Sequence, residues 1–85
     1  MVYILRCADD ALYVGETTDI GARMARHKEG GASRFTSLRR PVTLAFAEAH
    51  GSRTAALTRE RQIKRWTRAK KEALIAGDLA SRKRL

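Results

Sequence analysis

Residues 1–16 read MVYILRCADDALYVGE, and the rest of the architecture can be built outward from this stretch. Residues 2–7 and 12–16 are rich in β-branched and aromatic side chains, which is typical of strands. Asp9 and Asp10 between them are typical of a turn. The two segments therefore predict an antiparallel hairpin, in which the start of the first strand lies beside the end of the second.

A helix is predicted directly after the hairpin. The cluster TTD at residues 17–19 is typical of a helix N-cap, and the glycine pair at residues 30–31 is typical of a stop, which leaves a helix of about ten residues between them. Ile20, Met24 and His27 recur at i, i+4 and i+7, so they share one face of this helix.

The remainder of the chain adds one strand and two helices. Residues 31–41 (GASRFTSLRRP) predict a basic loop, residues 42–48 (VTLAFAE) alternate as a strand, and residues 53–66 and 68–76 predict helices, the last of which ends at Gly77. The order ββαβαα predicts an α+β fold, since a three-stranded sheet needs helices on at least one face to bury a core. We expect one domain over residues 1–77 and a basic C-terminal tail over residues 78–85.

Composition favours a nucleic-acid partner. The 85 residues include 18 Lys and Arg against 9 Asp and Glu, a formal net charge of +9, which on a small domain is typical of proteins that bind a polyanion. The single cysteine, Cys7, excludes an internal disulfide and a Cys-based zinc site, and its place in the first strand predicts a small buried side chain. No apolar run approaches the ~20 residues that span a bilayer, and charged residues interrupt the N-terminus, so we expect a cytoplasmic protein without a membrane partner.

Glu60 occupies an unusual place on the helix predicted over residues 53–66. It falls in the middle of the apolar stripe of this helix. The stripe consists of Ala56, Leu57, Ile63 and Trp66. A carboxylate on a buried face needs a cation, which can be a metal ion, an arginine or a lysine. The alternative is an ordinary i, i+4 pair with Lys64, or a side chain that reaches solvent at the edge of the stripe.

Tyr3, Tyr13 and Arg23 follow one another at intervals of ten residues. Tyr3 ends the triplet MVY, Tyr13 opens the triplet YVG, and His27 follows Arg23 by four positions on the predicted first helix. This pattern resembles the GIY-YIG nuclease family, with MVY in place of GIY and YVG in place of YIG. Glu16, directly after YVG, departs from other branches of the family and adds negative charge beside the expected site.

The resemblance extends over about residues 1–75 and is closest to the small single-domain members of the family. It rests on the segments YILRC (3–7), LYVG (12–15), TTD (17–19), RRPV (39–42), IKR (63–65) and KKEALI (70–75). It implies a three-stranded antiparallel sheet flanked by helices, and a metal-dependent endonuclease that hydrolyses phosphodiester bonds.

The resemblance also implies roles for five residues. Tyr3 is expected as the general base, helped by Tyr13 or a metal-bound water, and Arg23 as the clamp on the scissile phosphate. His27 matches a position that the family fills with His or Tyr, and Glu60 matches the single protein ligand of the catalytic Mg²⁺ or Mn²⁺. By default, the tyrosines are strand aromatics packed on the sheet, Arg23 is a solvated arginine, and His27 is a hydrogen-bonded histidine at the edge of the core.

The basic loop over residues 31–41 is the predicted path of the substrate strand. The expected nucleic-acid contacts are Arg34, Phe35, Arg39, Arg40 and, on the following helix, Lys64. Arginines can follow a phosphate backbone, and an exposed aromatic ring can stack an unpaired base. The alternative is a solvated loop in which Phe35 packs on the core.

Two classes of function are compatible with the sequence. The first is a DNA endonuclease in DNA repair, recombination or processing, and the second is a non-catalytic nucleic-acid-binding module of the same fold. A subunit that docks on a larger nuclease is a third, weaker alternative. A binding-only relative is expected to lose Glu60 or Arg23 first, and this chain keeps both, which favours the enzyme. Single-stranded, branched and duplex DNA all stay open as substrates, as do a partner protein and the oligomeric state.

Overall fold

The computed structural model describes residues 1–77 and confirms the predicted α+β fold. The strands are β1 (Val2–Arg6), β2 (Leu12–Glu16) and β3 (Thr43–Glu48), and the helices are α1 (Ile20–Glu29), α2 (Arg34–Ser37), α3 (Arg53–Lys64) and α4 (Arg68–Ala76). The predicted order is confirmed, with one addition: the segment predicted as a loop over residues 31–41 contains the four-residue helix α2. A single turn is too short to show helical periodicity in the sequence.

β1 is the central strand of an antiparallel sheet whose order is β2-β1-β3. Within the hairpin, Tyr3 pairs with Gly15 and Leu5 pairs with Tyr13, so the two tyrosines lie on the same face of the sheet on neighbouring strands. A register shift interrupts the pairing with β3 after Ile4. The hairpin register thus brings the two tyrosines close together, as the sequence predicts.

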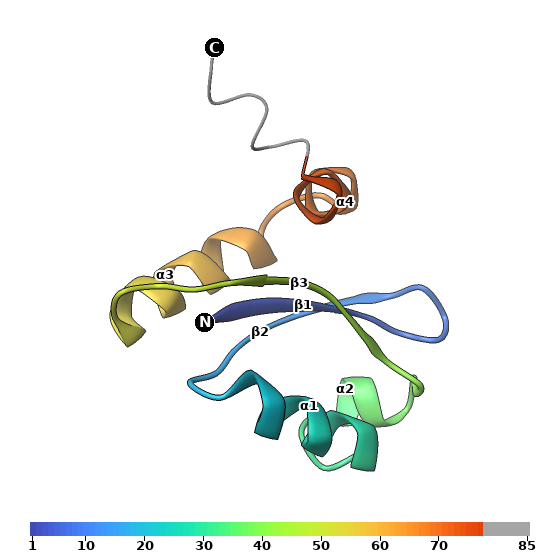
Figure 1. Cartoon of the computed structure of the whole chain (residues 1–85). Helices are drawn as coiled ribbons and strands as arrows, with labels where there is room; N and C mark the ends of the chain where they lie inside the picture. Colours follow the sequence, from blue (N-terminus) through green and yellow to red (C-terminus); the bar gives the residue numbers. More distant parts are fainter. Residues whose placement is uncertain (78–85) are drawn as a thin grey trace.

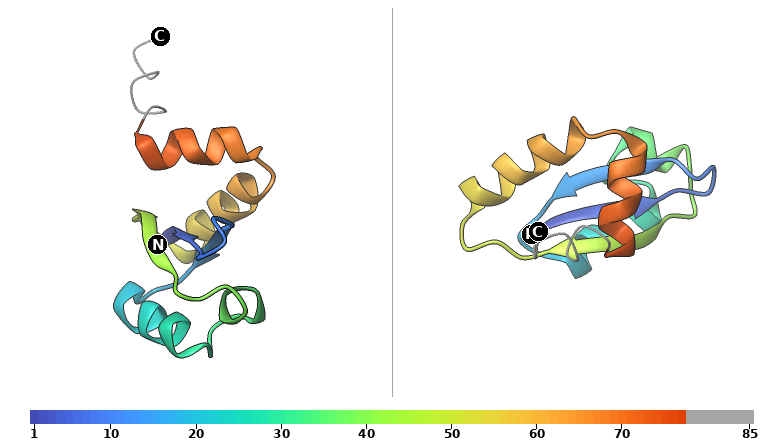
Figure 2. Two further views of the ribbon diagram at one scale, coloured as in Figure 1. Left: turned by 90° about the vertical axis from the view of Figure 1, so that its right-hand side faces the viewer. Right: turned by 90° about the horizontal axis from the view of Figure 1, so that it is seen from above.

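Helices cover both faces of the sheet. Figure 1 shows α1 and α2 on one side of the strands and α3 and α4 on the other. Viewed from above, α3 runs alongside the outer strand β2, whereas α4 crosses over the strands toward β3 (Figure 2). Helix α3 therefore lies next to β2, the strand that carries Tyr13.

The long helices begin and end at the signals found in the sequence. Asp19 caps α1 through a hydrogen bond from a backbone N–H of the first turn, and Gly30 ends the helix with a left-handed φ of 84°. Ser52 and Thr67 cap α3 and α4 in the same way as Asp19 caps α1. Helix α3 ends at Lys64 rather than at residue 66 as predicted.

Each face of the sheet has its own core. On the α3 and α4 side, the buried residues are Val2, Ile4, Val14, Ala56, Ile63 and Leu74. On the α1 and α2 side, they are Tyr3, Leu5, Cys7 and Val42, with Ile20 and Met24 packed against them. Successive residues of β1 therefore alternate between the two cores. The prediction that Cys7 is a small buried side chain is confirmed.

The predicted basic tail, residues 78–85, lies outside the described residues. Within residues 1–77, every helix is too short or too polar to cross a bilayer.

Candidate active site

Tyr3 lies at the centre of the candidate active site. Its side chain is fully buried on the α1 side of the sheet. Its hydroxyl oxygen lies 2.9 Å from Nε2 of His27 and 3.4 Å from a guanidinium nitrogen of Arg23. The three side chains come from β1 and from two successive turns of α1, so the packing of this helix on the sheet assembles them.

Gly15 leaves room for the Tyr3 ring. The ring passes over this residue on the neighbouring strand, and a Cβ built at residue 15 would lie 2.5 Å from the Tyr3 hydroxyl oxygen. Real Cβ atoms do not approach other atoms so closely. The glycine of the YVG triplet is therefore needed for the position of the other tyrosine, since any larger residue would displace the phenol.

His27 is fully buried on α1, and both of its ring nitrogens have partners. Nε2 contacts the Tyr3 hydroxyl, and Nδ1 lies 2.8 Å from Oγ1 of Thr36 on α2. Thr36 is fully buried as well, and its hydroxyl donates to the carbonyl oxygen of Ser33 at 3.3 Å. Burial lowers the pKa of His27, and the positive charge of Arg23 lowers it further, so the imidazole is neutral at neutral pH.

Arg23 reaches the Tyr3 hydroxyl from one turn before His27. Its guanidinium donates to that hydroxyl and to the backbone carbonyl of Glu16, each at 3.4 Å. Both distances are long for hydrogen bonds, and a guanidinium carries five N–H donors. Arg23 therefore keeps donors for a further acceptor, such as a phosphate group bound beside Tyr3.

The pKa of Tyr3 reports the charges around its hydroxyl. Burial raises this pKa, the hydrogen bond and charge of Arg23 oppose the rise, and the charges of Tyr13 and Glu60 add to it. The charge of Glu60, a residue of α3, is the smallest of these contributions to the pKa, and within the described residues its carboxylate makes no hydrogen bond to the Tyr3 hydroxyl.

Tyr13 is half-buried at the centre of a cluster of rings. Its ring centroid lies 6.4 Å from that of Tyr3, 5.4 Å from that of His27 and 5.9 Å from that of Phe35. Tyr13 thus packs against the rings of Tyr3 and His27, whose polar atoms contact each other. Its contacts hold Tyr3 and His27 in place from the side of β2.

Glu60 faces the body of the protein, as its place in the apolar stripe predicts. Its side chain is 16% exposed, and the ammonium group of Lys64 lies 3.4 Å from its carboxylate. The i, i+4 pair considered from the sequence is therefore present. Lys64 is more than half exposed, however, and such surface pairs hold their partners weakly. The carboxylate keeps oxygen lone pairs for another cation.

A divalent cation fits Glu60 if the remaining ligands are water and substrate. Within residues 1–77, no three His, Cys, Asp or Glu side chains gather to form an all-protein metal site. Mg²⁺ is usually held by one or two carboxylates together with water and phosphate oxygens, so a single carboxylate is a sufficient protein ligand. The partly buried Glu60, in electrostatic range of Tyr3, meets this requirement.

The carboxylate of Glu16 is paired at the border of α3 rather than at the Tyr3 hydroxyl. Its oxygens lie 3.6 Å from the guanidinium of Arg53 and 4.0 Å from the amine of Met1. Glu16 contributes only its backbone carbonyl to the surroundings of Arg23. The extra acidic residue after YVG thus has two positive groups nearby, although its buried Oε2 has no hydrogen-bond partner among the described residues.

Phe35 and Arg39 pack on each other at the outer end of the ring cluster. The Arg39 guanidinium lies 3.9 Å from the Phe35 ring centroid and pairs with Asp9 at 3.1 Å. Because Tyr13 also contacts this ring, Phe35 adopts the packed arrangement that the sequence left as an alternative to base stacking. It is still 37% exposed.

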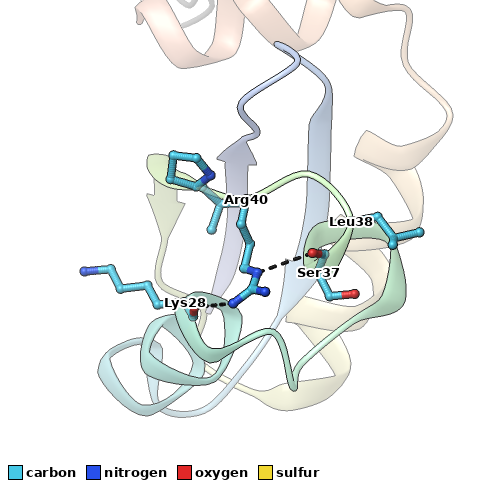
Figure 3. Close-up of a pocket in the computed structure, with 6 residues that line it drawn as sticks. Lys28, Ser37, Leu38 and Arg40 are labelled. Carbon is cyan, nitrogen blue, oxygen red and sulfur yellow. Dashed lines mark hydrogen bonds between the residues drawn. The ribbon is translucent and has the colours of Figure 1, made fainter.

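Arg40 ties together the ends of α1 and α2. Its guanidinium donates to the carbonyl oxygens of Lys28 at 3.1 Å and Ser37 at 3.3 Å (Figure 3). These residues border a surface hollow lined by Lys28, Ser37, Leu38, Arg40, Pro41 and Val42. None of the residues around the Tyr3 hydroxyl lines this hollow, so it is separate from the candidate active site.

A comparison with protein families identifies the family to which the chain belongs. The model of the GIY-YIG catalytic domain matches residues 1–73. The chain belongs to the GIY-YIG family. A UPF0213 protein of Natronomonas pharaonis is 46% identical to it over 77 residues, which is 91% of each chain. A UPF0213 protein of Staphylococcus aureus is 43% identical over 74 residues, 87% of this chain and 90% of the relative. No solved structure matches the chain significantly.

These relatives are small chains that the alignment nearly spans, which confirms the resemblance to the small single-domain members of the GIY-YIG family. The GIY-YIG domain brings together four of the residues singled out in the sequence, and the charge of a fifth acts on the same hydroxyl. The four are Tyr3, Tyr13, Arg23 and His27, and the fifth is Glu60. Of the basic residues singled out, Arg34, Arg39 and Arg40 lie on or directly after α2, and Lys64 lies beside Glu60.

Sequence reasoning missed Thr36 and its partner Ser33. Nothing in the sequence marks a threonine nine positions after His27 in a segment that reads as a loop. Only the fold of that segment over α1 makes the contact visible.

Proposed function

We propose that this protein is an endonuclease that hydrolyses phosphodiester bonds in DNA with the help of Mg²⁺ or Mn²⁺. The observation that carries the proposal is the meeting of three side chains at one oxygen atom. The Tyr3 hydroxyl has the neutral imidazole of His27 at 2.9 Å, the guanidinium of Arg23 at 3.4 Å, and the charge of Glu60 within electrostatic range. Phosphodiester hydrolysis needs a proton acceptor, a cation for the phosphate and a ligand for a metal ion, and these groups supply all three.

Tyr3 acts as the general base. Because burial raises its pKa, the phenol is protonated at neutral pH. It can take a proton from an attacking water only while it gives its own proton away. The imidazole of His27, at 2.9 Å, is the acceptor in reach.

Arg23 holds the scissile phosphate. Its two long contacts leave donors that a phosphate oxygen can accept, and a phosphate bound there lies next to the Tyr3 hydroxyl. The same guanidinium offsets the charge that develops on the phosphate in the transition state. Loss of such a donor typically costs about 10²–10³ in rate.

Glu60 would hold the divalent cation, at the carboxylate that Lys64 contacts at 3.4 Å. When bound, the cation polarises a phosphate oxygen and offsets the negative charge that develops on it.

DNA is the proposed substrate because of the net charge of +9 and the basic residues around the site. Arg34, Arg39, Arg40 and Lys64 are the proposed phosphate contacts, with Phe35 beside them. No helix of the sequence-reading type is evident, so single-stranded and branched DNA are the first substrates to test. We place this activity in DNA repair, recombination or processing in the cytoplasm.

The decisive experiment compares two acidic variants. Glu60→Gln keeps the size of the side chain but removes the charge that binds a cation. Glu29→Gln is the matched control. Glu29 is an exposed residue of α1, and it forms no ion pair with any residue that the structure describes. Cleavage of supercoiled plasmid and of single-stranded and branched oligonucleotides is measured with Mg²⁺, with Mn²⁺ and with EDTA.

We expect the wild type and Glu29→Gln to cleave at the same rate, and Glu60→Gln to lose cleavage while it still binds DNA. Full activity of Glu60→Gln would remove the metal role from this residue. Binding without cleavage by the wild type, on every substrate and with either metal, would favour the non-catalytic module instead.

A further inference from the structure

Four polar groups, three of them fully buried, form a continuous series of hydrogen bonds that leads from the start of α2 to the candidate base. The carbonyl oxygen of Ser33 accepts from Oγ1 of Thr36 at 3.3 Å, and this oxygen lies 2.8 Å from Nδ1 of His27. Nε2 of His27 lies 2.9 Å from the hydroxyl oxygen of Tyr3. Thr36, His27 and Tyr3 are all fully buried, so solvent does not compete for the two hydrogen bonds of the imidazole, whereas the bond from Thr36 to Ser33 is partly buried.

The number of available hydrogen atoms determines which group donates and which accepts in each of these hydrogen bonds. The Thr36 hydroxyl has one hydrogen, which it donates to the Ser33 carbonyl, so its oxygen must accept from Nδ1–H of His27. A neutral imidazole carries a single N–H. Nε2 is then left with its lone pair, and the Tyr3 hydroxyl must donate to it.

The opposite arrangement, with the hydrogen of His27 on Nε2, leaves a buried hydrogen without an acceptor. If His27 carried its hydrogen on Nε2, Tyr3 would accept from both His27 and Arg23, and its own buried hydrogen would have no acceptor among the described residues. Thr36 would also have to turn its hydrogen from Ser33 to Nδ1. A buried donor without an acceptor costs about 1–3 kcal/mol, so the first arrangement is the stable one.

We propose that Thr36 is a positioning residue for catalysis: its hydroxyl holds the proton of His27 on Nδ1 and thereby keeps the Nε2 lone pair aimed at Tyr3. The consequence for the reaction rests on the proposed nuclease function. As the water oxygen forms its bond to phosphorus, its proton moves to the Tyr3 oxygen and the phenolic proton moves to Nε2, while the bond from phosphorus to the leaving oxygen breaks.

The proton count closes after product release. The leaving oxygen takes a proton from solvent. His27, which then carries two N–H groups, returns the Nε2 proton to the Tyr3 oxygen, and Tyr3 gives the proton that it took from the water to solvent. Thr36 still accepts from Nδ1 in the charged state, so it does not need to move during the cycle. A residue that only filled space at this position would have no such effect on the ring.

The first test reads the position of the proton directly and needs no substrate. The chain has two histidines, so a long-range ¹H–¹⁵N correlation spectrum of the full chain shows two imidazoles, and His50→Gln identifies the signals of His27. We expect Nδ1 to be protonated and Nε2 to be bare in the wild type. Protonated Nε2 in the wild type would overturn the proposal, whatever the activity.

The second test removes the hydroxyl of Thr36. Thr36→Val keeps the branched shape without the acceptor, and Thr36→Ser keeps the acceptor without the methyl group. We expect Thr36→Val to lose the fixed Nδ1–H form of His27, and Thr36→Ser to keep it. If Thr36→Val does not fold, the spectra of the wild type and of Thr36→Ser still decide the matter.

The third test is kinetic. We expect Thr36→Val to lower kcat about 10- to 100-fold, the range for loss of a partner that orients a histidine, with KM within a few-fold of the wild type and with rescue by Thr36→Ser. An altered tautomer with an unchanged kcat would overturn the catalytic consequence. A wild type with the predicted tautomer but no cleavage of any DNA would contradict the proposed function and leave the orienting role of Thr36 established.

Discussion

The two faces of one three-stranded sheet do different work in this protein. The face toward α3 and α4 buries aliphatic side chains, such as Ile4, Ile63 and Leu74. The face toward α1 and α2 buries a phenol, an imidazole and a threonine hydroxyl that are hydrogen-bonded to one another. Because β1 alternates between them, neighbouring residues of one strand contribute to the aliphatic core and to the candidate active site.

The comparison teaches where a small domain can build an active site. A chain of 85 residues has little interior, and apolar burial is its main source of stability. The α3 and α4 face can supply that burial and leave the other face free for polar groups whose every hydrogen bond must be satisfied. Glu60 belongs to α3, and its charge makes a small contribution to the raised pKa of Tyr3 on the other face.

The largest expected effect breaks the apolar face alone. Leu74→Ala removes a buried side chain of α4 far along the chain from the site, and such truncations cost about 2–5 kcal/mol of unfolding free energy. We expect a much lower urea midpoint, followed by the fluorescence of Trp66, which packs against the same core. The cleavage rate per folded molecule should stay within a few-fold of the wild type. A rate loss of a hundredfold would mean that the two faces are not separable.

The next effect breaks the polar face. Tyr3→Phe and Arg23→Ala should each lower kcat at least about a hundredfold, which is about 2.7 kcal/mol of transition-state stabilisation. DNA binding should change little for Tyr3→Phe and modestly for Arg23→Ala, as measured by fluorescence anisotropy. Rates close to the wild type in both variants would put the active site elsewhere on the molecule.

A pair of glycine variants tests how tightly the polar face is packed. Gly15→Ala places a Cβ 2.5 Å from the Tyr3 hydroxyl, so we expect a loss of stability of about 1–3 kcal/mol and a fall in kcat of tenfold or more. Gly21→Ala is the control, because a Cβ there meets only Asp19, at 3.6 Å. It should stabilise α1 by up to about 1 kcal/mol with no change in rate. Equal behaviour of the two variants would contradict the close fit of Tyr3 over Gly15.

Much of this arrangement could be predicted from the sequence because it depends on local signals. β-Branched and aromatic composition predicted the first two strands, and alternation predicted the third. The TTD cluster predicted the start of α1, and helical spacing predicted that Glu60 faces inward. The register of the hairpin follows from its short turn, and it brings Tyr3 near Tyr13.

The remainder depends on contacts between segments that no local signal describes. Helix α2 is a single turn, so it has no periodicity, and with it the role of Thr36 was hidden. The arginines of the same segment read as free phosphate ligands, but Arg39 pairs with Asp9 and Arg40 caps the ends of two helices. The number of charged residues can be read from a sequence, whereas the partner of each charge in the folded protein cannot.

A smaller effect concerns the path of the DNA around the polar face. Arg34 is exposed, and within the described residues its side chain makes no ion pair or hydrogen bond, so Arg34→Ala tests a phosphate contact cleanly. We expect the slope of log K against log salt to fall by about one unit per lost contact. The Arg39→Ala/Arg40→Ala double variant should lower the slope as well, but with a loss of stability, because both guanidiniums also support the fold. An unchanged salt slope in all of these variants would mean that the segment that contains these arginines does not contact the DNA.

The smallest expected effect appears only in acid and concerns the attachment of α4. Arg6 of β1 donates to both carboxylate oxygens of Glu72, at 2.6 and 2.9 Å, and Arg68 donates at 3.0 Å. The hydrogen bonds from Arg6 first, and those from Arg68, lower the pKa of Glu72 from 4.5 to about 2. A carboxylate whose pKa is lower in the folded than in the unfolded state stabilises the fold above the unfolded pKa, and this contribution is lost as the pH falls toward the folded pKa. We therefore expect the difference in urea midpoint between the wild type and Glu72→Gln to be constant above about pH 5 and to shrink as the pH approaches about 2. Glu29→Gln, which changes an exposed carboxylate of α1, should show no such trend. A difference that does not depend on pH would mean that Glu72 acts on α4 through its shape and not through its charge.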